Sequence, residues 1–107
     1  MKADIAQMEF VDKTVRAIVT DLEEQTGLEF TTTSLYRIGD AGVHGTLPVR
    51  GIDLRMRNES VGGAITALIN SRWQYDHKRP GMTCAVLHGE GRNLHIHIQS
   101  HPNTREI

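Results

Sequence analysis

The stretch Asn93-Leu-His-Ile-His-Ile-Gln99 decides the fold prediction, because its apolar and polar side chains alternate without a break. Successive side chains of a strand point to opposite faces of a sheet. Its three aliphatic side chains therefore share one face, and His95 and His97 share the other. One apolar and one polar face is typical of an antiparallel sheet that is covered on one side only.

A hairpin is expected just before this strand. Residues 82–87 have strand character, and Gly89-Glu-Gly-Arg92 has the composition of a turn. The turn lacks the lysine and the following helix of a phosphate-binding loop. A four-residue turn places His88 opposite Asn93, on the same face as His95. Its imidazole is then either an additional ligand to a metal ion bound on this face or a solvent-exposed group at the end of the strand, and the second interpretation is favoured.

The same register places Cys84 opposite His97. A fourth metal ligand is conceivable at that position, but a buried structural thiol is favoured because cysteine is among the residues most often buried.

The remaining elements follow from periodicity. Residues 52–57 alternate as a half-buried strand, and residues 28–38 form a strand or an extended approach to one. Residues 3–25 show the three- and four-residue spacing of an amphipathic helix that ends at Thr26-Gly27. A second helix begins at Asn58 or Ser60, with its apolar side formed by Val61, Ala64, Ile65, Leu68, Ile69 and Trp73.

These elements predict an α+β fold in which a small antiparallel sheet is flanked by two helices. Residues 1–107 are expected to form a single domain with an N-terminal helix within 1–27, a metal-binding core over 30–99 and a polar, frayed tail over 100–107. Trp73 is assigned to the core, with a substrate wall shared with Tyr75 as the alternative. His77 and His101 are assigned to the surface.

Composition excludes several classes of function. The chain has 107 residues, and 12 basic against 13 acidic side chains give a net charge of -1, which disfavours binding to nucleic acid or to an anionic membrane. A single cysteine excludes a disulfide framework. The absence of a signal peptide or of a spanning apolar run predicts a cytoplasmic protein, released only with a holin or on lysis.

Two imidazoles and a carboxylate form the strongest candidate site. Asp53 lies on the polar face of its strand, and His44 is upstream across a loop that contains Gly45 and Gly51. Two histidines and one carboxylate hold a catalytic zinc ion that keeps a fourth position open for water.

The order of these features resembles the LAS group of zinc peptidases, which includes D-alanyl-D-alanine carboxypeptidases, murein endopeptidases and phage L-alanyl-D-glutamate endolysins. That group has a histidine, a short loop with glycine, an aspartate opening a strand, a helix, and a hairpin that ends in His-X-His. Here these are His44, the loop 45–51, Asp53 in Gly-Ile-Asp-Leu-Arg55, the helix from Val61, and His95-Ile-His97. The resemblance covers about residues 30–99.

The resemblance implies roles for individual residues. His44, Asp53 and His97 would bind zinc, and His95 would face the substrate or the attacking water. Arg55 or Arg50 would lie near the scissile carbonyl. The proton acceptor is then His95 or the turn residue Glu90. The implied activity is hydrolysis of a cell-wall peptide bond by a phage-encoded protein, with a peptide as the partner.

Two other functions are consistent with the residues. A non-catalytic protein of the same fold would bind a metal or a protein partner as an accessory factor. A histidine-rich protein would bind copper or nickel through His88, His95 and His97 without needing His44 or Asp53. The sequence makes no prediction of the oligomeric state.

Overall fold

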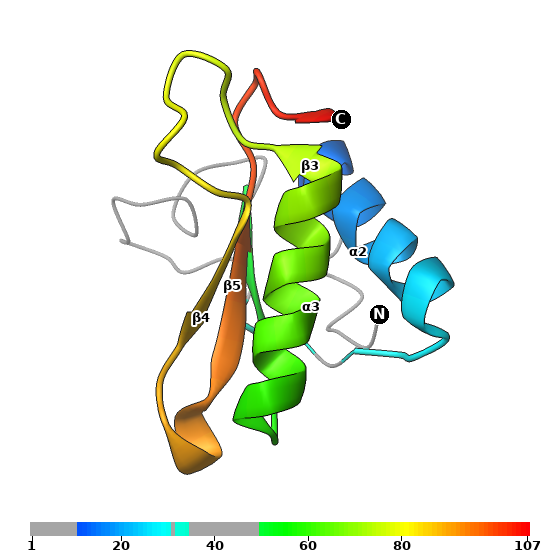
Figure 1. Ribbon diagram of the computed structural model, residues 1–107. Helices are drawn as coiled ribbons and strands as arrows, with labels where there is room; N and C mark the ends of the chain where they lie inside the picture. The colour runs from blue at the N-terminus through cyan, green and yellow to red at the C-terminus, as the bar shows by residue number, and fades with distance from the viewer. Residues whose placement is uncertain (1–10, 31, 35–49) are drawn as a thin grey trace.

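The computed structural model describes residues 11–30, 32–34 and 50–107. Its longest elements are two helices and a four-stranded antiparallel sheet (Figure 1). The helices are α2 (Lys13–Thr26) and α3 (Glu59–Arg72). The sheet has the order β1-β2-β5-β4, formed by Thr32–Ser34, Gly51–Arg55, His95–Gln99 and Ala85–His88. The predicted α+β class with an antiparallel sheet and two flanking helices is confirmed.

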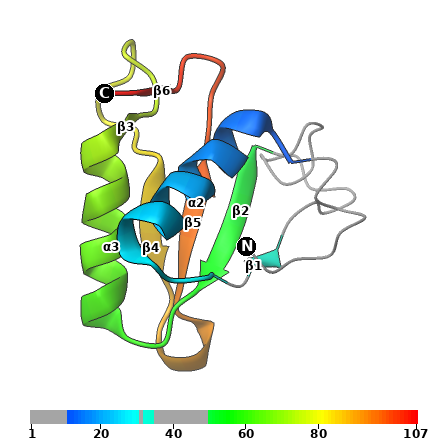
Figure 2. The same cartoon turned by 90° about the vertical axis from the view of Figure 1, so that its right-hand side faces the viewer.

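Both helices lie on the same face of the sheet, as the two views show (Figures 1 and 2). This face carries the aliphatic side chains of the alternating strands. The core is formed between the layers, and its fully buried side chains include Ile18, Leu22, Ile52, Leu54, Ile69, Ile96 and Ile98. Burial of this face orients the alternation, so the polar side chains of β2 and β5 all point away from the helices.

Helix α2 is shorter than predicted. Asp12 has extended backbone angles (φ -55°, ψ 139°), and its carboxylate accepts hydrogen bonds from the backbone N–H groups of Thr14 and Val15. This is an N-cap, which ends the helix on its N-terminal side. A continuous helix over 3–25 is therefore wrong, although residues 3–10 lie outside the described part of the chain. The predicted C-terminal stop is confirmed, because Gly27 adopts the left-handed conformation (φ 70°).

Of the two predicted starts of helix α3, Asn58 is the cap, and its side chain accepts a hydrogen bond from the N–H of Val61. Its buried stripe differs from the prediction. Val61 and Ala64 are exposed, and Gly62 is buried instead with Ile65 and Ile69. The absence of a side chain at Gly62 lets the first turn of α3 approach β4, where a Cβ atom would lie 2.9 Å from Cδ1 of Leu87.

The other strands are shorter than the patterns suggest. Of residues 28–38, only Thr32–Ser34 form a strand among those described, and residues 35–38 lie outside that part. The hairpin strands begin at Ala85 and His95 rather than at residues 82 and 93.

The C-terminal tail is ordered, contrary to the prediction. Strand β6 (Arg105–Glu106) pairs with β3 (Trp73–Gln74) in a second, two-stranded sheet. Ser100 is buried and its hydroxyl donates to the Asp12 carboxylate across 3.1 Å. Backbone pairing and side-chain hydrogen bonds thus outweigh the polarity of the tail.

An ion pair joins the two helices at the end where β3 begins. The Arg72 guanidinium donates to both carboxylate oxygens of Asp21 at 2.7 and 2.8 Å. The indole N–H of Trp73 adds a bond of 3.3 Å to the same carboxylate. These hydrogen bonds lower the pKa of Asp21, and the one from Arg72 has the larger effect. Trp73 is buried in the core, as predicted.

No helix among the described residues is long and apolar enough to cross a bilayer.

Candidate functional site

The polar side chains of β2, β5 and β4 form two rows on the sheet face opposite the helices. In one row, Asp53 pairs with His97 across β2 and β5. In the adjacent row, Arg55 of β2 lies opposite His95 of β5, which in turn lies opposite His88 of β4. We call these five residues the histidine face.

Asp53 and His97 are in direct contact. Oδ1 of Asp53 lies 2.9 Å from Nδ1 of His97, and the two side chains are only 10% and 19% exposed. The pair joins positions 44 residues apart in the chain. Because a buried carboxylate is costly without a partner, this contact contributes to stabilising Asp53 at this depth.

His95 has a defined orientation. Its Nδ1 lies 2.6 Å from the carbonyl oxygen of Asn93. A carbonyl only accepts hydrogen bonds, so Nδ1 carries the proton and the neutral ring has Nε2 as its acceptor. The ring of His88 lies beside it, with ring centroids 5.8 Å apart and planes inclined by 32°.

The hairpin register differs by two residues from the predicted one. His88 faces His95 rather than Asn93, and Val86 rather than Cys84 faces His97. The connection between the strands is longer than predicted because it contains the short 3-10 helix η2 (Gly91–Asn93). In this helix, the N–H of Asn93 donates a hydrogen bond to the carbonyl of Glu90. A shift of two preserves the faces, so His88 still shares the face of His95.

Cys84 is fully buried in the core cluster, as the favoured interpretation predicts. Burial raises the pKa of its thiol to about 11. The register removes it from the neighbourhood of His97, so the alternative role as a fourth ligand is not supported.

The structure separates the two candidate arginines. Arg55 is exposed at the end of β2 and lies next to His95. Arg50 precedes the other end of the strand, where its carbonyl accepts from the N–H of Ser100. Glu90 is exposed in the hairpin turn.

The three predicted zinc ligands are only partly placed. Asp53 and His97 are together, whereas His44 lies outside the described residues. Within the described ranges, no group of three or more His, Cys, Asp or Glu side chains is arranged to hold a metal ion.

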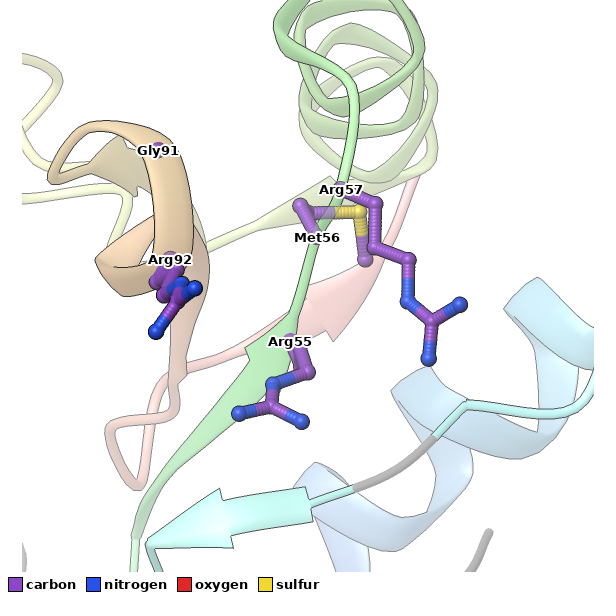
Figure 3. Close-up of a pocket in the computed structure, with 5 residues that line it drawn as sticks. All are labelled: Arg55, Met56, Arg57, Gly91 and Arg92. Carbon is purple, nitrogen blue, oxygen red and sulfur yellow. The ribbon is translucent and has the colours of Figure 1, made fainter.

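Sequence reasoning did not identify the cavity at the end of the histidine face. A cavity of about 500 Å³ is lined by Arg55, Met56, Arg57, Gly91 and Arg92 (Figure 3). A second cavity, of about 340 Å³, lies between Arg55, Arg92 and the residues Asn93–His95. The available signals were the Arg-X-Arg spacing at the end of β2 and the arginine in the turn.

His101 is half-buried, so its side chain is less exposed than the surface position that the sequence predicts. Its ring packs against Tyr75, with centroids 5.8 Å apart, and Nδ1 lies 3.7 Å from the buried carboxylate of Asp76. His77 is exposed, as predicted. Tyr75 is buried within the core cluster, so it does not form an open substrate wall.

Asp76 is the centre of this second polar cluster. Its carboxylate accepts from the backbone N–H of Lys78 and from the side chains of Asn103 and Arg79. These hydrogen bonds hold the pKa of Asp76 well below its usual range, and the one from the Lys78 backbone has the largest effect. The cluster attaches the loop after β3 to the C-terminal segment.

No protein-family model, no curated protein and no solved structure matches this chain.

Proposed function

We propose that the protein is a zinc-dependent peptidase of the LAS type, which hydrolyses a peptide or amide bond in bacterial cell-wall peptide and is phage-encoded. The observation that carries the proposal is the contact of Asp53 with His97, with His95 in the adjacent row of the same face. The order of these residues in the sequence supports the same group.

The types of donor atom support the proposal, because zinc takes a carboxylate oxygen and an imidazole nitrogen as ligands. A tetrahedral ion with nitrogen and oxygen ligands at roughly 2.0–2.1 Å separates its ligand atoms by about 3.3 Å. The Asp53 oxygen and the His97 nitrogen are 2.9 Å apart, so a movement of a few tenths of an ångström would accommodate both as ligands. His44 would supply the third ligand from the segment before β2.

Zinc would supply a Lewis acid that polarises the scissile carbonyl and lowers the pKa of water bound to it. His95 is oriented to accept a proton at Nε2, because its Nδ1 proton is held by the Asn93 carbonyl. Returning that proton to the leaving amine completes the bond cleavage. Glu90 remains the alternative acceptor from the exposed turn.

Arg55 is the better candidate for stabilising the carbonyl oxygen as negative charge develops on it. It lies opposite His95 in the same row, and the two residues line one cavity. A guanidinium there would stabilise the charge close to the group that moves the proton. Arg50 precedes the other end of β2, on the far side of the Asp53 row.

Elemental analysis of the metal-loaded protein tests the proposal. We expect one zinc ion per chain in the wild type, and loss of zinc in His44→Ala, Asp53→Ala and His97→Ala. His77→Ala serves as the matched control, since His77 is exposed in the loop after β3. If the wild type binds no zinc even when zinc is supplied, the proposal is wrong.

The contact between the His88 and His95 rings favours a second candidate function, binding of copper or nickel through His88, His95 and His97. That function predicts metal loss in His88→Ala and retention in Asp53→Ala. Bound zinc without hydrolysis of wall peptides would instead support a non-catalytic accessory protein of the same fold.

A further inference from the structure

Three arginines gather at the end of the histidine face. Arg55 and Arg57 come from the end of β2, and Arg92 comes from the turn between β4 and β5 (Figure 3). All three are exposed. They line the 500 Å³ cavity together, so three positive charges from two separate segments surround one space.

No carboxylate of the described residues forms an ion pair with any of these guanidinium groups. Two acidic side chains, Glu59 and Glu90, line an adjoining cavity with Arg57 but not with Arg55 or Arg92. Like charges that gather without a counter-charge repel one another. Since the chain has a net charge of -1, this is a local concentration of positive charge and not a property of the whole surface.

The backbone holds the two segments at a fixed separation. The N–H of Met56, between Arg55 and Arg57, donates to the carbonyl of Leu94 across 3.0 Å. The turn that carries Arg92 is shaped by Gly89, which has φ +82° and lies so close to Asn93 that a Cβ atom would clash with the Asn93 carbonyl. The backbone segments that carry the arginines therefore have a defined position relative to each other.

Arg55 and Arg92 also line the second cavity, which extends to His95. The arginines are thus continuous with the histidine face. A group bound between Arg55 and Arg92 would lie next to the imidazole proposed to carry the proton.

We infer that Arg55 and Arg92, with Arg57 at the rim, form a subsite for an oxyanion. Guanidinium groups bind carboxylate and phosphate through paired, charge-assisted hydrogen bonds, and planar arginine is well suited to both. If the proposed peptidase activity holds, on which this part of the inference rests, the substrate is a peptide with a carboxylate close to the bond that is cleaved.

The test measures anion binding to the metal-free full-length chain, so that it is independent of zinc. The probes are N-acetylglutamate, inorganic phosphate and, as the uncharged counterpart, N-acetylglutamine amide. Amide chemical shifts of Gly91 and Asn93 report binding. The variants are Arg92→Gln and Arg92→Lys, and Arg16→Gln is the matched control, since Arg16 is an exposed arginine on α2.

We expect the shifts to saturate with N-acetylglutamate and not with the uncharged analogue. Arg92→Gln should weaken binding by about tenfold, as removal of a charge-assisted hydrogen bond does. Arg92→Lys should restore only part of the affinity, and Arg16→Gln should change it less than about twofold, as expected for a distant, screened charge.

Absence of saturation with both anions, or equal weakening by Arg92→Gln and Arg16→Gln, would overturn the subsite. Saturation with phosphate alone would keep an oxyanion subsite and overturn the assignment of a carboxylate substrate. Anion binding by a chain that takes up no zinc would refute the peptidase and leave the subsite intact. Zinc-dependent hydrolysis without anion binding would support the peptidase and refute the subsite.

Discussion

Two adjacent glycines in the first turns of α3 should respond differently to the same substitution. Gly62 faces β4, and a Cβ atom there would lie 2.9 Å from Cδ1 of Leu87 and 3.4 Å from Cγ of Met56. At Gly63, no atom lies within 4 Å of the position of a Cβ atom. Both residues are helical, so alanine has the same intrinsic advantage at each position.

That advantage is about 0.8–1 kcal/mol in a helix interior. At Gly63 nothing opposes it, and we expect Gly63→Ala to raise the free energy of unfolding by this amount. At Gly62 the side chain of Leu87 must move. The contact is with the end of a partly buried side chain, so a rotamer change of about 0.5–1.5 kcal/mol suffices. Gly62→Ala should then be neutral within about 0.5 kcal/mol as the difference of these two effects.

Urea denaturation followed by far-UV circular dichroism measures both variants against the wild type. The quantity to compare is the difference between the two variants, which we expect to be about 1 kcal/mol. Equal stabilisation by both substitutions would show that Gly62 does not set the distance between α3 and β4, and the packing argument would be refuted.

Three further predictions concern the turn, the loop after β3 and the thiol. Gly89→Ala should lower the free energy of unfolding more than Gly91→Ala, for which about 1 kcal/mol is expected, because both have positive φ but only Gly89 also meets the Asn93 carbonyl; similar losses in urea denaturation would contradict this. The pKa of Asp76 is lowered in the folded protein, so its stabilisation is present above the ordinary pKa of about 3.9 and is lost as the pH falls below it. Asp76→Asn should therefore lose stability at pH 7 and depend less on pH between 5 and 3 than the wild type does; parallel profiles would show that the carboxylate is not responsible. Because Cys84 is buried with a raised pKa, iodoacetamide should label it at least about 100-fold more slowly in buffer than in denaturant, and equal rates would mean that the core around it opens readily.

Local patterns predicted the parts of the fold that depend on neighbouring residues. The cap at Asn58 and the stop at Gly27 follow from hydrogen bonding and backbone angles within one turn of a helix. The alternation over 93–99 predicted which side chains share a face, because the period of a strand is fixed by its own geometry.

Local patterns did not predict the structure of segments whose conformation depends on contacts with distant parts of the chain. The polarity of the last residues suggested a frayed tail, yet β6 finds a partner in β3, and Ser100 finds one in Asp12, 88 residues away in the chain. The alternating pattern also could not fix the hairpin register, since the turn at Glu90–Asn93 adds two residues without changing the faces.

By itself, the sequence determined that Asp53, His95 and His97 lie on polar strand faces, because each face is a local property of its strand. Only the tertiary structure decided that Asp53 meets His97, since pairing of β2 with β5 depends on burying the aliphatic side chains of both strands beneath the helices. The same pairing, with the turn that precedes β5, brought Arg92 to Arg55. No pattern within either segment carries information about the other, because their proximity results from packing of the whole core.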